Sequence, residues 1–337
     1  MIDFSFYPNA ARAKALDTRM RAELARSLEY IVTQLESRLP DTEAGKYTGM
    51  LAPILSLLHS RRVSPATFAS YYQLVLSLLD ENTDIADKVV RLVAVAEPRD
   101  LLSFKELNAE GLGSQELVSL YRSCLDTDEN FKFEFLSPQP DESARTRASV
   151  IRALALMKKI VPAMAAEFES LISEVILAAA SKKPDAPRFD GGSSYMLWGA
   201  LALSVDDEKS DLAMMETLAH EGAHCFLFGL TMEEPLVNND DSDLYHSPLR
   251  QDPRPMDGIY HAAYVSARMH YAMSAAWNSG LLNDAQMQEC ATCLKASEQS
   301  FNNGYSVVAD KGDLSATGHA IMDNACEYMR KHTSNSG

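Results

Sequence analysis

The stretch Ser194–Gly229 reads SYMLWGALALSVDDEKSDLAMMETLAHEGAHCFLFG and sets the order of elements in the second half of the chain. It begins with a short apolar run bounded by turn-forming residues, and the length of this run favours a strand. Apolar residues then repeat at helical spacing up to Gly229, which predicts a long helix with this glycine as its C-cap. We therefore expect a strand followed by a long helix.

Helical periodicity dominates the rest of the chain. Apolar residues recur every three or four positions in Asp17–Leu39, Ser64–Leu79, Gln115–Cys124, Ser143–Ala180 and Tyr260–Trp277. Residues 180–194, ASKKPDAPRFDGGSS, are typical of a linker or long loop. The sequence therefore predicts a mainly α (α+β) fold, with a helical N-terminal region over residues 1–183 and a second region over residues 184–337. The role of the first region stays open.

Composition limits the class of protein. The chain has 337 residues and a formal net charge of −16, which disfavours binding to nucleic acid and to anionic membranes. No apolar stretch approaches the roughly 18 residues of a membrane span, and no signal peptide is visible. Five cysteines, an odd number, do not suggest a disulfide framework. These features favour a cytoplasmic enzyme.

His220, Glu221 and His224 form an HExxH motif within the predicted helix. Two histidines four positions apart lie on one helical face, so both imidazoles can reach a single metal ion. Apolar neighbours suggest a buried segment, where histidines need polar or metal partners. The motif therefore predicts a metal-binding catalytic region over residues 184–337, with a zincin-like order of strand and helix.

A zinc peptidase needs a third protein ligand besides the two histidines. In many HExxH peptidases this ligand is a glutamate on a downstream helix, but no glutamate occurs between Glu234 and Glu289. The extended motif HExxHxxGxxH is also missing. Neither common completion of a zinc site is present.

The downstream helix offers His261 as a third ligand instead. Asp257 competes with it, because two histidines and one carboxylate form the set of many non-haem Fe(II) oxygenases. His246 is a weaker candidate, since its surroundings are typical of a loop. We expect His270 to lie outside the coordination sphere or on the surface.

Two longer segments carry a more specific signal: LAHEGAHCFLFGL, residues 218–230, and YHSPLRQDPRPMDGIYHAAYV, residues 245–265. Together they resemble the HExxH-type peptide β-hydroxylases that depend on 2-oxoglutarate, which are encoded in gene clusters for ribosomally made peptides. The similar stretch runs from about Met196 to Met273, less than a quarter of the chain.

This resemblance implies a mononuclear Fe(II) site formed by His220, His224 and His261. Dioxygen would be activated there with 2-oxoglutarate as co-substrate, and a residue of a precursor peptide would be hydroxylated at its β-carbon. Other modification proteins from the same gene cluster are possible partners.

The distal carboxylate of 2-oxoglutarate calls for a cation, and a guanidinium group suits it best. Arg254 is our first choice, because the flanking prolines Pro253 and Pro255 restrict its backbone. Arg250 and Arg268 are the alternatives, the latter because its spacing places it near the helical face of His261.

Two other functions stay open. The first is a zinc metallopeptidase, in which Glu221 would act as the general base; in an oxygenase Glu221 would instead orient an imidazole or a water. The second is a non-catalytic peptide-binding partner. For any of them, an edge strand over Met196–Ser204 is a candidate for pairing with an extended peptide. The CATC segment, residues 290–293, is a lone CxxC without a second cysteine pair, so we expect no metal or redox role for it.

Overall fold

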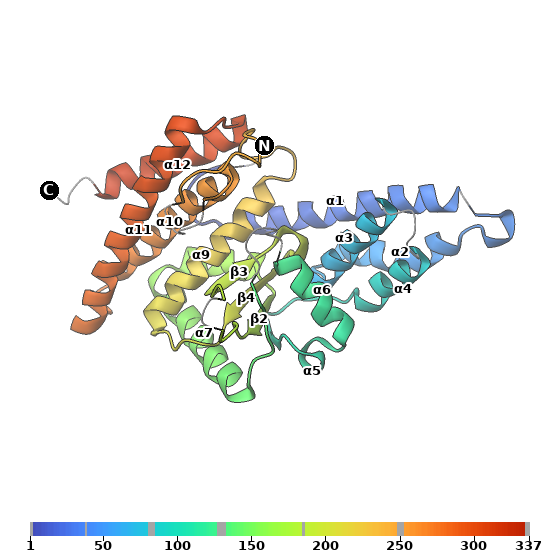
Figure 1. Ribbon diagram of the computed structural model, residues 1–337, viewed down its shortest axis with the longest axis horizontal. Coiled ribbons are helices and arrows are strands. Elements are labelled where there is room, and N and C mark those ends of the chain that lie inside the picture. Colours follow the sequence, from blue (N-terminus) through green and yellow to red (C-terminus); the bar gives the residue numbers. More distant parts are fainter. Residues whose placement is uncertain are drawn as a thin grey trace. The chain divides into compact units, whose positions relative to one another are not determined.

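The computed structural model describes residues 3–37, 39–79, 85–126, 133–183, 186–247 and 253–333 (Figure 1). Within these ranges the protein is mainly helical and contains one small four-stranded mixed sheet. The mainly α (α+β) class expected from the sequence is thereby confirmed.

The α-helices are α1 (Ala10–Glu36), α2 (Lys46–Ser60), α3 (Pro65–Leu79), α4 (Ile85–Val95), α5 (Ala109–Leu112), α6 (Gln115–Leu125), α7 (Pro140–Ile160), α8 (Pro162–Leu171), α9 (Asp211–Leu230), α10 (Met256–Trp277), α11 (Asp284–Lys311) and α12 (Ala316–Thr333). The strands are β1 (Ser103–Glu106), β2 (Glu174–Ala178), β3 (Gly191–Ser193) and β4 (Ala200–Ser204). Two short 3-10 helices, η1 (Asp41–Glu43) and η2 (Tyr195–Leu197), complete the described elements.

The chain forms two compact units that interleave in sequence. Unit 1 comprises residues 1–13, 148–168 and 209–337, and unit 2 comprises residues 14–147 and 169–208. This division differs from the single boundary expected near residue 183. The reason is that residues 148–168 pack with the C-terminal helices: Phe168 lies against Gly222, and Arg152 pairs with Asp211.

The sheet belongs to unit 2 and has the strand order β1-β2-β4-β3. Strands β1, β2 and β4 are parallel, whereas β3 runs antiparallel to β4. Both β2 and β4 are fully buried, as apolar runs in parallel sheets usually are. The strand predicted before the HExxH helix is therefore present as β4. It lies between two other strands, so the expectation of a peptide-binding edge strand there is wrong.

Residues 143–180, predicted as one helical stretch, contain three elements. Helix α7 ends at Ile160, α8 begins at Pro162, and β2 follows. Proline lacks the amide hydrogen that a continuous helix needs, so the break falls at Pro162. The β-branched pair Val175 and Ile176 then forms the centre of the parallel sheet.

The four long helices α9 to α12 belong to unit 1 (Figure 1). Helix α10 packs against α9, α11 and α12, and most of its side chains are buried. Helix α9 begins after Ser210, whose hydroxyl accepts a hydrogen bond from the amide of Ala213 at 2.9 Å. It continues through Gly229 to Leu230, so Gly229 is not the C-cap; that position is Thr231.

Candidate metal-binding site

Three imidazoles from two helices of unit 1 lie in a row. His220 and His224 project from α9 one helical turn apart, and His261 projects from the second turn of α10. Nε2 of His224 lies 3.1 Å from Nε2 of His220, and Nδ1 of His224 lies 2.9 Å from Nδ1 of His261. The rings of His224 and His261 are stacked, with centroids 5.2 Å apart. The structure thus brings the three predicted ligands together.

Burial keeps two of the three imidazoles uncharged, those of His224 and His261. Burial, with the neighbouring His220 and His261, lowers the pKa of His224 well below its usual 6.5. Burial also lowers the pKa of His261, although Asp257 acts in the opposite direction. At neutral pH both imidazoles are therefore neutral, the form that binds metal.

Two of the three imidazoles in the row are spaced as ligands of one metal ion are. Two nitrogens that each lie about 2.1 Å from one ion are roughly 3 Å apart when the bond angle is near 90°, and the Nε2 atoms of His220 and His224 meet this condition. His224 turns its other nitrogen towards His261. With the side chains in their present positions, no group of three potential ligands in the described part of the chain is arranged to hold a metal ion. A tripod of all three imidazoles requires rotation of one ring.

Two carboxylates flank the row. Oε1 of Glu221, which is 4% exposed, lies 4.0 Å from Nε2 of His220. Oδ1 of Asp257 lies 3.9 Å from Nε2 of His261, on the ring edge opposite His224. Asp257 is therefore placed to orient His261, as carboxylates commonly orient metal-binding histidines.

One aromatic ring and one thioether lie beside the imidazoles. The ring of Phe228 lies 6.3 Å from that of His224 and 5.5 Å from that of His261. Sδ of Met269 lies 3.3 Å from Nδ1 of His220. Neither residue is predicted as part of the site from the sequence. Phe228 was detectable from its spacing, since it follows His224 by one helical turn.

Arg254 lies beside the start of α10. Its backbone pairs with Tyr245, with N–O distances of 2.7 and 2.8 Å. Its side chain covers Gly258, where a Cβ atom would lie 3.4 Å from Cβ and 3.5 Å from Nε of the arginine. Gly258 precedes His261 by three positions and so shares its helical face. Arg254 therefore lies beside the first turn of α10, the helix that carries His261.

Arg268 has another environment. It is 2% exposed, and its guanidinium pairs with Glu167 and donates to the carbonyl of Phe6 at 2.7 Å. With these donors engaged inside the protein, the structure does not present Arg268 as a binding group for a co-substrate.

Two further histidine candidates, His246 and His270, have other surroundings. His246 is exposed in a loop, and Arg250 lies outside the described residues. His270 is 5% exposed, and its Nδ1 lies 3.0 Å from the hydroxyl of Tyr328. It is thus a buried histidine with a protein partner, not a surface residue.

Gly222, inside the HExxH motif, allows close packing that the sequence did not reveal. A Cβ atom at this position would lie 3.1 Å from Cδ2 of Phe168 on α8. The glycine therefore lets α8 approach the part of α9 that carries His220 and His224.

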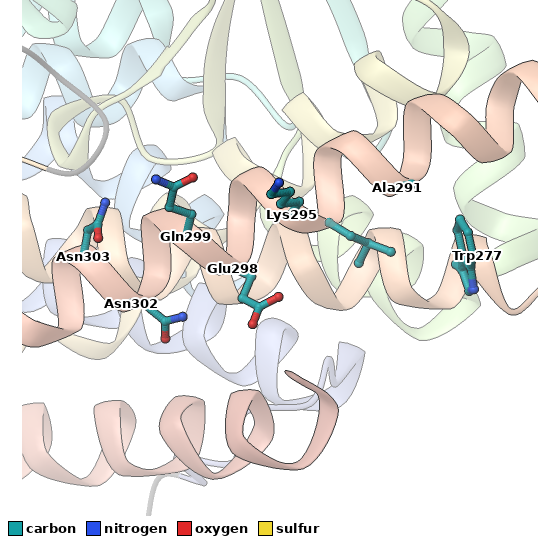
Figure 2. A pocket seen from close by; sticks show the side chains of 8 residues that line it. Trp277, Ala291, Lys295, Glu298, Gln299, Asn302 and Asn303 are labelled. Carbon is teal, nitrogen blue, oxygen red and sulfur yellow. The ribbon is translucent and has the colours of Figure 1, made fainter. Parts of the chain in front are cut away.

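A groove of about 700 Å³ lies along α11, away from the imidazole row. Figure 2 shows the amide and charged side chains that follow one face of this helix, with Trp277 at one end. None of the three row histidines lines the groove, whose lining residues are Trp277, Ala291, Leu294, Lys295, Glu298, Gln299, Asn302 and Asn303.

Comparison with known proteins assigns no family. No family model matches the chain, and no curated protein matches it. In the part of the chain that the structure describes, no helix is both long enough and apolar enough to span a membrane.

Proposed function

We propose that this protein is a 2-oxoglutarate-dependent Fe(II) dioxygenase that hydroxylates the β-carbon of a residue in a ribosomally made precursor peptide. One observation carries the proposal: His220, His224 and His261 come from two helices and form a contiguous row of imidazoles. Histidine-rich sites with open positions suit non-haem iron. The zincin-like order of strand and helix along the chain and a cytoplasmic location belong to the same proposal.

Each side chain has a role in it. His220, His224 and His261 would hold the iron, and Asp257 would orient His261. Bound Fe(II) supplies the site for dioxygen activation, in which one oxygen atom enters the peptide and the other enters succinate as 2-oxoglutarate loses carbon dioxide. Arg254 would bind the distal carboxylate of 2-oxoglutarate through paired hydrogen bonds.

Glu221 supports a second candidate, a zinc metallopeptidase. Its carboxylate is buried and lies 4.0 Å from Nε2 of His220. A carboxylate in this place is suited to take a proton from a water molecule that is bound to a zinc ion held by the histidines. In the oxygenase no such proton transfer is needed, so the two functions differ in their dependence on Glu221.

The test compares two metal forms of wild type and Glu221→Gln. Each protein is loaded without oxygen with Fe(II) or with Zn(II). The Fe(II) form then receives 2-oxoglutarate and oxygen, and succinate is measured even without a peptide, because uncoupled turnover suffices. The Zn(II) form receives casein, and newly formed amino groups are measured.

We expect succinate from the Fe(II) form of both proteins and no casein cleavage. Cleavage by the Zn(II) form that disappears in Glu221→Gln, without succinate from the Fe(II) form, would establish the peptidase instead. If neither product forms while a precursor peptide still binds, the protein is a non-catalytic partner.

A further inference from the structure

Residues 3–9 bind to unit 1 through buried polar groups instead of lying loosely on its surface. Arg12, which is 6% exposed, donates hydrogen bonds to the carbonyls of Asp3, Ser5 and Tyr7 at 3.0, 2.5 and 2.7 Å. One guanidinium thereby fixes three peptide groups of a segment that has no regular secondary structure.

A second guanidinium and a carboxylate complete this attachment. Arg268 donates to the carbonyl of Phe6 at 2.7 Å, and Glu167 accepts from the amide of Asn9 at 2.8 Å. Glu167 also pairs with both guanidiniums, at 3.4 Å from Nη2 of Arg12 and directly with Arg268. The result is a buried Arg–Glu–Arg network. Its two guanidiniums also donate hydrogen bonds to backbone carbonyls of residues 3–9.

Phe6 is the apolar anchor of the segment. Its side chain is 2% exposed and is stacked on Tyr328 with ring centroids 4.5 Å apart. It also contacts the edges of Tyr264 and Tyr271, which project from α10. Residues 3–9 are therefore held both by charge and by an aromatic pocket.

The network reaches α9, the helix of the HExxH motif. The guanidinium of Arg12 lies 4.5 Å from the ring centroid of Phe226, two positions after His224. Phe168, the chain neighbour of Glu167, packs on Gly222 between the two motif histidines. The residues that attach the segment, or their chain neighbours, thus also contact the helix that carries the HExxH motif.

The network also reaches α10, the helix of His261. Arg268 follows His261 by two helical turns on one face of this helix, and its guanidinium is bound to Glu167 and Phe6. The helices that carry His220, His224 and His261 are therefore joined by one set of buried charges.

Buried ion pairs rarely add net stability, because desolvation offsets their attraction; their best-attested use is to fix one arrangement among several. We propose that residues 3–9 are a positioning strap: through Arg12, Glu167 and Arg268 they fix α9 and α10 relative to one another, and thereby set the metal affinity of the imidazole row. This inference rests on the proposed function, since it assumes that the row binds a metal.

The test uses the full chain and Co(II), which is stable in air and absorbs visible light according to its ligand geometry. Co(II) is titrated into wild type, Phe6→Ala, Arg268→Met and Arg268→Lys. Arg152→Met is the matched control, because Arg152 also pairs with a carboxylate, Asp211 of α9, but at the surface. Circular dichroism at the titration temperature establishes that each variant is folded.

We expect Phe6→Ala and Arg268→Met to weaken Co(II) binding at least tenfold and to change the absorption spectrum. Arg268→Lys, which restores the charge and one donor, should recover part of the affinity. Arg152→Met should bind as wild type does. If Phe6→Ala does not fold, the comparison of Arg268→Met with Arg268→Lys decides the question.

Folded variants that bind Co(II) with wild-type affinity and spectrum would overturn the strap and leave the proposed function intact. Two results would overturn the metal site itself: wild type binds no Co(II), or His220→Ala binds Co(II) as tightly as wild type does. The strap proposal would then fall with the metal site.

Discussion

At the scale of single residues, burial sets the chemical state of side chains between α9 and α11. Burial and Glu216 raise the pKa of Cys293 to about 12, and burial raises the pKa of Cys290 to about 11. Both thiols are therefore protonated at neutral pH, which makes them poor nucleophiles.

Replacing Glu216 with glutamine should make Cys293 more reactive. The change removes the negative charge that opposes ionisation, so the pKa of Cys293 falls and the thiolate fraction at pH 8 rises several-fold. Alkylation by iodoacetamide, followed by mass spectrometry of the peptide that contains Cys293, measures the rate. Glu298→Gln, on another part of α11, is the control; equal rates in both variants would contradict the prediction.

Local sequence predicts some site residues and cannot predict others. The spacing of His220 and His224 fixes their common face without knowledge of the fold. Arg268 has the spacing of a site residue too, but its partner Glu167 is 101 positions away in the chain. No local pattern shows that a distant carboxylate engages this guanidinium.

At the scale of elements, α12 is docked through one close backbone contact. A Cβ atom at Gly318 would lie 2.0 Å from the carbonyl oxygen of Leu236. The same carbonyl accepts a hydrogen bond from the amide of Ser315 at 3.1 Å, and the carbonyl of Gly318 accepts one from the hydroxyl of Tyr260 at 2.8 Å. The start of α12 is thus tied both to the loop after α9 and to α10.

Gly318→Ala should therefore destabilise the protein. The backbone must move to admit the methyl group, at a cost of about 1–3 kcal/mol in the free energy of unfolding. Gly49→Ala is the matched control, because its Cβ meets nothing within 4 Å on α2; it should stabilise by up to about 1 kcal/mol through helix propensity. Urea unfolding measures both, and a Gly318→Ala variant as stable as wild type would refute the packing argument.

The sequence predicts helices with a repeated apolar pattern better than it predicts the strand β2. The periodic patterns locate α3, α6 and α10 to within a few residues, because their apolar positions repeat over several turns. Strand β2 was missed, since its five buried residues carry no alternation and follow helical patterns directly. Its identity depends on pairing with β1 and β4, which lie far from it in the chain.

At the scale of the whole molecule, buried histidines link stability to pH. Burial and the neighbouring His332 lower the pKa of His270 from 6.5 to about 4. Between these values the unfolded chain binds a proton that the folded chain does not. The contribution of His270 to stability is therefore complete above pH 6.5 and is lost as the pH falls towards 4. His224 and His261 act in the same direction.

The free energy of unfolding of wild type should fall as the pH decreases from 7 to 4.5. The free energy of unfolding of His270→Phe should fall less steeply over the same range. A shift from 6.5 to about 4 corresponds to a loss of about 3 kcal/mol, since one pKa unit equals about 1.4 kcal/mol. Urea unfolding at several pH values measures the slope. His59→Gln, at an exposed position of α2, is the control. Equal slopes for wild type and His270→Phe would show that His270 does not titrate as described.

The central claim is that His220, His224 and His261 bind iron together with 2-oxoglutarate. The most direct measurement is an anaerobic titration of the Fe(II)-loaded protein with 2-oxoglutarate, followed by visible absorption. We predict a saturable charge-transfer band that is absent in His261→Ala. In Arg254→Ala it should require about 10- to 100-fold more 2-oxoglutarate, the effect of losing charge-assisted hydrogen bonds, while Arg152→Ala should titrate as wild type does. No band in wild-type protein that retains its Fe(II), or an undiminished band in His261→Ala, would contradict the claim.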